Sequence, residues 1–140
     1  MEERIKHVEI AGKAYPLNFS VSAANEVTRR YGGITGINDA LGLGSTQEDQ
    51  TPEQKERAGA RIRDEIAWLL ALLIQQGIAY EKLMGGAPEK PLTEDEICIL
   101  ASPSDILGMR LSVLEAVGAG LGVTVETEPD VKNAETTQGN

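Results

Sequence analysis

The chain contains one long apolar run, IAWLLALLI, at residues 66–74. A helix that buries only one face carries polar residues on its other faces, whereas this run is apolar on all sides for about two and a half turns. A run of this length falls well short of the roughly 20 residues that span a bilayer, so we expect no transmembrane segment. The run therefore predicts a central helix, surrounded either by the rest of the chain or in part by a second copy or a client protein.

Clear start and stop signals bound the helix that holds this run. Thr51 is a candidate N-cap, Pro52 suits the first helical position and Gln54 can complete a capping box. Glycines and prolines over residues 85–91 end the pattern. The sequence thus predicts a helix over about 52–84. Its main apolar stripe consists of Ile62, Ile66, Leu69, Leu73 and Tyr80.

The chain before this helix predicts a hairpin and two short helices. Apolar residues alternate with other residues on both sides of a glycine turn, which is typical of a β-hairpin over 4–20. Capping and glycine signals then predict helices over about 21–32 and 35–41. Residues 42–50, with two glycines and few apolar side chains, are expected to form a flexible loop.

The chain after the long helix predicts two more helices, at about 94–101 and 103–121, each opened by a capping signal. Residues 123–125 can add a third strand, and residues 129–140 are polar and acidic, as in disordered tails. The predicted fold class is α+β: an N-terminal β-hairpin packed on a mainly helical domain of four to five helices, all within residues 1–128, followed by a disordered acidic C-terminal tail.

The charge of the chain narrows the choice of partners. Among 140 residues, 22 are acidic and 13 are basic, which gives a formal net charge of -9. This charge repels nucleic-acid phosphates and anionic lipid heads, so we expect no nucleic acid and no membrane as partner. With one cysteine and one histidine, the chain can form no internal disulfide and few metal sites. We therefore expect no enzyme activity, no cofactor and no metal, and we expect another protein as the partner.

Four features that suggest chemistry have simpler structural explanations. The glycines over 118–122 resemble a nucleotide-binding loop but follow a helix, so we expect a helix end. The acidic residues at 94–96 lack the spacing of a calcium loop and suit the first turn of a helix. Cys98 lies between two isoleucines with no basic neighbour, so we expect a small core residue. His7, on a charged strand, is expected to face solvent.

The candidate partner-binding residues lie on the apolar run itself. Leaving two or three of its leucines in water would forgo on the order of several kcal/mol, so an exposed arrangement needs a partner. Leu70, Leu72 and Ile74 lie off the main stripe. Together with Trp68, they are our candidates for contact with another chain.

Two stretches near the N-terminus carry a resemblance to a known family. The pattern VEIAGKAYPLNF occupies residues 8–19, and the short helix that follows ends in RYGGI at 30–34. Together they resemble the tail assembly chaperones of long-tailed phages and prophages of Gram-positive bacteria. The resemblance covers about residues 5–41. The remainder is similar in architecture: a long apolar helix, a proline-rich break, further helices and an acidic tail.

This resemblance implies a non-enzymatic protein of the host bacterial cytoplasm. Such a chaperone binds and solubilises the tape measure protein, helps to recruit tail tube subunits and is absent from the mature virion. A homo-oligomer is compatible with this role. The alternative is a minor structural or adaptor protein that is retained in the phage tail, and a small enzyme or ligand-binding domain is a third possibility.

The resemblance also implies a longer product, made by ribosomal frameshifting near the end of the short gene. The peptides Val-Lys-Asn at 131–133 and Gln-Gly-Asn at 138–140 can both be encoded with a slippery heptanucleotide. We expect one of them to slip, the second by preference because it lies at the stop. The longer product would then recruit the tail tube protein.

Overall fold

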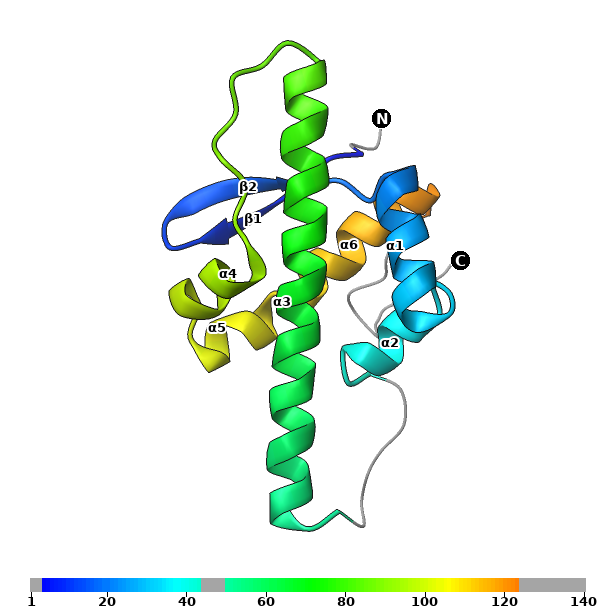
Figure 1. Cartoon of the computed structure of the whole chain (residues 1–140), viewed down its shortest axis with the longest axis vertical. Helices are drawn as coiled ribbons and strands as arrows, with labels where there is room; N and C mark the ends of the chain where they lie inside the picture. Colours follow the sequence, from blue (N-terminus) through cyan, green and yellow to red (C-terminus); the bar gives the residue numbers. More distant parts are fainter. Residues whose placement is uncertain (1–3, 44–49, 124–140) are drawn as a thin grey trace, which may run out of the picture.

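The computed structural model describes residues 4–43 and 50–123, and Figure 1 shows their arrangement. In chain order the elements are β1 (Lys6–Ile10), β2 (Lys13–Leu17), α1 (Val21–Tyr31), α2 (Gly36–Ala40), α3 (Pro52–Leu83), α4 (Glu94–Leu100), α5 (Pro103–Gly108) and α6 (Arg110–Leu121). An N-terminal antiparallel hairpin precedes a mainly helical region, so the predicted α+β class is confirmed.

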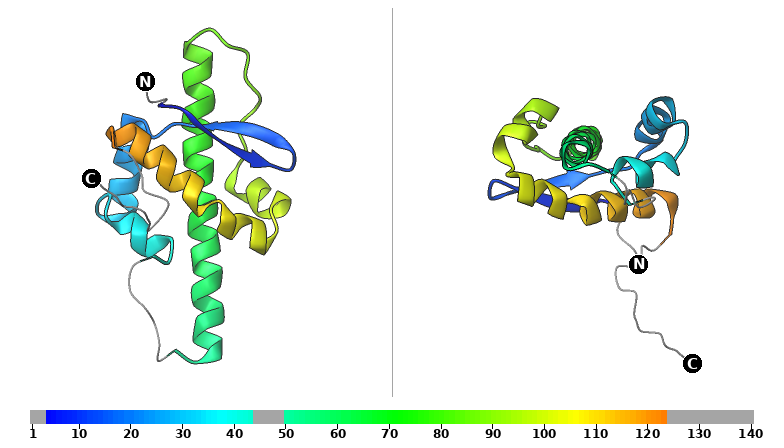
Figure 2. Two further views of the ribbon diagram at one scale, coloured as in Figure 1. Left: turned by 180° about the vertical axis from the view of Figure 1, so that it is seen from behind. Right: turned by 90° about the horizontal axis from the view of Figure 1, so that it is seen from below.

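Helix α3 forms the long axis of the molecule, and the other elements surround its middle and upper part in the view of Figure 1. Figure 2 shows the hairpin and α6 on one side of α3, with α1 and α4 flanking it. The first turns of α3 extend away from this body, and residues 52–57 are exposed. The apolar run at 66–74 therefore lies at the level where the other elements gather.

The hairpin turns tightly at Ala11 and Gly12. Both residues have positive φ, at 53° and 83°, as the two-residue turns that match strand twist require. Val8 and Tyr15 face each other across the two strands, and both are buried. His7, which points to the opposite face of the sheet, is exposed as predicted.

Strand β2 crosses α3 so closely that backbone contacts backbone. Gly77 has no side chain at the crossing, and a Cβ atom there would overlap the Pro16 carbonyl group. The Asn18 amide donates a 3.1 Å hydrogen bond to the Leu73 carbonyl, and the Asn18 side chain donates to the Gln76 carbonyl at 3.2 Å. These contacts hold the end of the hairpin against residues 73–77 of α3.

Three helices begin with capping boxes, as the sequence signals predict. Thr51, Thr93 and Ser102 each accept a hydrogen bond from the amide three residues later, whose side chain bonds back to the cap amide. The single helix expected over 103–121 is a partly wrong prediction, because the chain breaks at Met109 between α5 and α6. Gly108, a poor helix former, stands at this break.

The core lies between α3 and the elements around it. Its largest fully buried side chains are Ile10, Val27, Leu17, Leu41, Ile66, Leu69, Leu70, Leu73, Ile74, Ile97 and Val113. The prediction that Cys98 is a core residue is wrong, since Cys98 is exposed. Successive helix residues point about 100° apart, and Ile97 takes the inward position of α4.

Some predictions fall outside the described residues. Val123 is described and does not belong to a strand, whereas the other two residues of the expected third strand lie outside. The expected disordered tail at 129–140 also lies outside, as do residues 44–49 of the expected loop.

Candidate functional site

The rest of the chain covers the apolar run on most of its sides and leaves one side open. The fully buried members of the run are Ile66, Ala67, Leu69, Leu70, Leu73 and Ile74. Trp68, Ala71 and Leu72 are only partly buried and pack against the edge of the core. One face of α3 therefore remains accessible between its neighbours.

The structure divides the four candidate partner-binding residues into two pairs. Leu70 and Ile74 have no exposed surface, so the prediction that they contact another chain is wrong. They lie off the main stripe, but the hairpin and α6 cover α3 in addition to the flanking helices, and the buried arc is wider than one stripe. Trp68 and Leu72 remain at the accessible face.

Trp68 and Leu72 line an open groove with a volume of about 450 Å³. Its floor is one face of α3, and its walls are α1 and the segment that leads into α4, which flank α3 in Figure 1. The other lining residues are Ser22, Glu26, Ala71, Gln75, Gln76, Pro91, Leu92, Thr93 and Glu94. We call this feature the α3 groove.

Contacts from α1 hold Trp68 in position on the floor of the α3 groove. The Tyr31 ring meets the Trp68 ring edge to face, with centroids 5.8 Å apart and planes at 85°. The Arg30 guanidinium lies 4.3 Å from the centroid of the Trp68 ring, where the negative face of the ring attracts the cation. Both contacts restrict the indole, so Trp68 presents a preformed apolar surface.

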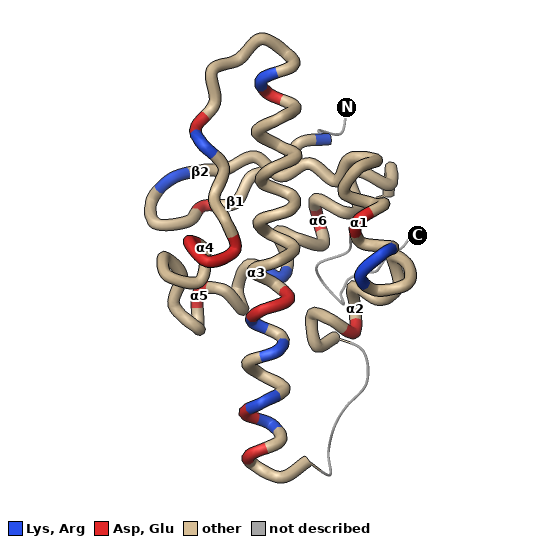
Figure 3. The backbone as a smooth tube through the Cα atoms, viewed as in Figure 1, with Lys and Arg blue, Asp and Glu red and all other residues tan. Residues whose placement is uncertain are grey.

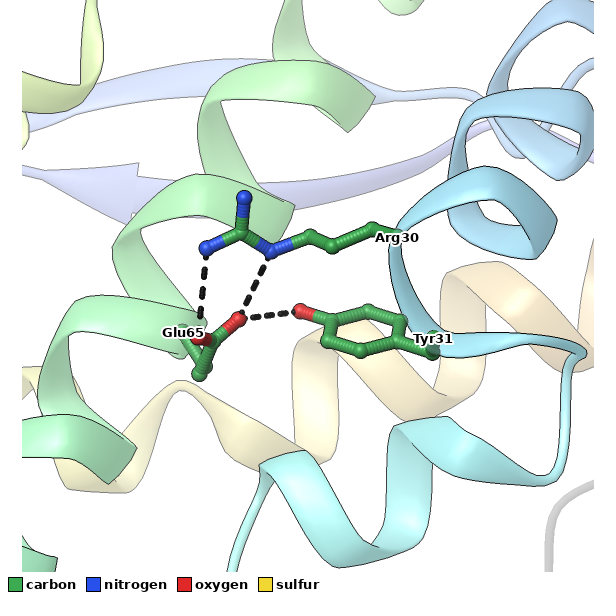
Figure 4. Close-up of polar contacts among 3 residues, drawn as sticks. All are labelled: Arg30, Tyr31 and Glu65. Atoms are coloured by element: carbon green, nitrogen blue, oxygen red, sulfur yellow. Dashed lines mark hydrogen bonds and ion pairs between the residues drawn. The ribbon is translucent and has the colours of Figure 1, made fainter.

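Glu65 of α3 holds the two α1 residues in turn, as Figure 4 shows. It accepts two hydrogen bonds from Arg30, at 2.9 and 3.1 Å, and one from the Tyr31 hydroxyl at 2.6 Å. Partial burial acts to raise the pKa of Glu65, but these hydrogen bonds outweigh it and hold the pKa below its ordinary value. Burial, followed by the hydrogen bond to Glu65, raises the pKa of Tyr31. Glu65 is therefore charged and Tyr31 protonated at neutral pH, as the hydrogen bond requires.

The network of Arg30, Tyr31 and Glu65 could not be predicted from the sequence. The sequence places Tyr31 on one face of the helix with Ala24 and Val27, and Arg30 and Tyr31 belong to the stretch RYGGI that carries the family resemblance, but it gives no reason to single out Glu65. An Arg-Tyr pair in the last turn of a helix was the only available signal. Nothing in the sequence spacing places Glu65, 34 residues after Tyr31, beside that pair.

Carboxylates gather where α3 meets the start of α4, and Figure 3 shows acidic positions on both helices. Partial burial, together with Asp64, Glu94 and Asp95, raises the pKa of the Cys98 thiol. We call these three carboxylates the acidic rim; of the three, Glu94 lines the α3 groove. The expected first-turn position of Glu94 and Asp95 is confirmed. In the described part of the chain, no group of three or more His, Cys, Asp or Glu side chains is placed to hold a metal ion.

Two further expectations concern the end of α6 and membrane spans. Gly122, with φ of 77°, caps α6 in the left-handed conformation, so the helix does end in this stretch, while Gly118 and Gly120 lie inside the helix. Among the described residues, no single helix has the length and apolarity to cross a membrane. Helix α4 and the segment Pro103–Leu121 reach those values only as a pair, bent by 115°.

Comparison with protein-family models, with curated proteins and with solved structures gave no significant match to this chain.

Proposed function

We propose that the protein is a tail assembly chaperone of long-tailed phages or prophages, and that the α3 groove binds a helix of the tape measure protein. The sequence patterns at residues 8–19 and 30–34 support the family. The observation that carries the proposed site is the accessible apolar floor formed by Trp68, Ala71 and Leu72, while the other residues of the apolar run at 66–74 are buried.

The geometry of the floor suits a helical client. Its α3 residues, at positions 68, 71, 72, 75 and 76, follow the spacing of a single helix face. A client helix laid between α1 and the start of α4 can bury its own apolar residues against this face, in the way that amphipathic helices enter grooves. The formal charge of -9 would then keep such complexes apart from one another.

In this function the protein acts without a chemical step. It binds the tape measure protein in the host bacterial cytoplasm, keeps it from aggregating and leaves before the virion is complete. A longer, frameshifted product recruits tail tube subunits to the same client. The gene order gives an independent check, because a tail tube gene upstream and a very long helical reading frame downstream are expected.

Coexpression with the protein encoded by that long reading frame tests the proposed site. The wild-type chain is expected to raise the soluble fraction of the client, and Leu72→Glu is expected to abolish this effect. The matched control is Leu83→Glu, which places the same charge on α3 at a side chain that is 87% exposed and outside the α3 groove. Circular dichroism and thermal unfolding of both variants establish that they fold.

Two results would contradict the proposal. Equal loss of client solubility with Leu72→Glu and Leu83→Glu would remove the α3 groove as the site. A stoichiometric amount of this chain in purified virions would favour the alternative, a minor structural or adaptor protein that is retained in the tail.

A further inference from the structure

We infer that the α3 groove selects amphipathic helices that carry lysine or arginine on the flank that faces α4. The inference rests on the proposed function in one respect, because it takes a helix as the occupant of the groove. It goes further, because it assigns a charge pattern to that helix. Through this pattern it also assigns the direction in which the helix runs along the groove.

The first step is that only part of the groove is apolar. Trp68, Ala71 and Leu72 supply the apolar floor, and Gln75 and Gln76 continue it as polar side chains. The floor from residue 68 to residue 76 is about 12 Å long at 1.5 Å per residue, or roughly two turns. Because the apolar contact is so short, it discriminates little between different client helices. Charged residues on the flanks of the client helix can therefore contribute to which helix is bound.

The second step is that the wall on the α4 side is acidic. Glu94 lines the groove, Asp95 follows it in the first turn of α4, and Asp64 lies on α3 about one turn before Trp68. None of these three carboxylates takes part in the ion pairs found within the described residues, which are Lys13–Glu89, Arg29–Glu26 and Arg30–Glu65. The acidic rim therefore keeps its charge available to a cation on a client.

The third step is that the opposite wall offers little net charge. Glu26 of α1 lines the groove, and its carboxylate pairs with Arg29 at 2.8 Å. Arg30 is held between Glu65 and the Trp68 ring. A cation is therefore attracted to the α4 wall and not to the α1 wall, so a helix with basic residues on one flank has a preferred orientation.

Three synthetic peptides of about 18 residues, long enough for a helix of five turns, test this inference. They share one apolar leucine and alanine face and contain no tryptophan. One flank carries lysine in the first peptide, glutamine in the second and glutamate in the third. Trp68 is the sole tryptophan of the chain, so its fluorescence reports occupancy of the groove directly.

We expect the lysine peptide to bind about tenfold more tightly than the glutamine peptide, and the glutamate peptide to bind more weakly than both. The preference for lysine should largely disappear at about 0.5 M salt, because exposed charges are screened. It should also disappear in the variant Asp64→Asn, Glu94→Gln, Asp95→Asn. The control Glu9→Gln, Glu81→Gln, Glu115→Gln makes the same change of net charge outside the groove and should keep the preference.

The possible failures are distinguishable. Equal affinity for the three peptides would overturn the charge selection and leave the α3 groove as a helix site. Loss of the preference in the control variant would assign it to the net charge of the chain, and this too would overturn the inference. If no peptide changes Trp68 fluorescence while the chain still solubilises its client, the groove is not the site and the chaperone function stands without it.

Discussion

The backbone of Gly77 on α3 lies directly against the carbonyl group of Pro16 on β2. No other residue type leaves room for this approach, since any Cβ atom would overlap the strand. We expect Gly77→Ala to lower the free energy of unfolding by about 1–3 kcal/mol, because the added Cβ atom would push the strand away and would strain the Asn18–Leu73 hydrogen bond. Urea unfolding followed by circular dichroism measures the change.

The same substitution at Gly59 is a control that should change the free energy of unfolding in the opposite direction. Gly59 lies in the exposed first half of α3, and a Cβ atom there would meet only the Arg63 guanidinium, at 3.4 Å. Gly59→Ala should therefore raise the free energy of unfolding by about 0.5–1 kcal/mol, the difference in helix propensity. Similar effects at the two glycines would contradict the close crossing of β2 and α3.

Two leucines two residues apart should separate stability from binding. Leu70 is fully buried, so Leu70→Ala should cost about 2–5 kcal/mol of unfolding free energy. Leu72 is only partly buried on the floor of the groove, so Leu72→Ala should cost about 1 kcal/mol but weaken peptide binding. Thermal unfolding and Trp68 fluorescence titration measure the two effects. A larger loss of stability for Leu72→Ala would place that residue in the core.

The Arg30–Tyr31–Glu65 network predicts a specific dependence on pH. The folded-state pKa of Glu65 lies below its ordinary value of 4.5, so its charge stabilises the fold above that pH and the contribution is lost as the pH falls through the lowered pKa. Glu65→Gln should therefore destabilise the fold by about 1 kcal/mol at neutral pH, a modest amount because Arg30 is partly exposed. The difference from wild type should shrink at about pH 3. If the stability difference between wild type and Glu65→Gln is the same at neutral pH and at about pH 3, the carboxylate charge does not stabilise the fold.

The exposed thiol of Cys98 gives a test of the acidic rim that needs no ligand. Partial burial and the carboxylates of Asp64, Glu94 and Asp95 raise its pKa, so Cys98 should react with an aromatic disulfide reagent without unfolding, but more slowly than an unfolded thiol. Neutralising the three carboxylates should increase the rate at neutral pH. An unchanged rate would mean that these charges lie too far from the thiol to form a rim.

Local signals predicted the elements well, for reasons that can be traced to particular residues. Thr51, Thr93 and Ser102 each mark a helix start, because a capping box involves only four consecutive residues. The alternation around Gly12 predicted the hairpin in the same way. Met109 marks the limit of such signals, since the apolar pattern over 103–121 continues through a break in the helix.

Which residues share a surface depends on contacts between distant parts of the chain. The sequence alone determined the fold class, the helix starts and a central apolar helix, because propensity, capping and periodicity act over a few neighbouring residues. Only the tertiary structure decided that Leu70 and Ile74 are interior while Trp68 and Leu72 line a groove, and that Glu65 meets Tyr31. In a run that is apolar on all sides, such as residues 66–74, no periodic pattern of polar residues shows which face is accessible. That face is defined by where the hairpin, α1, α4 and α6 pack.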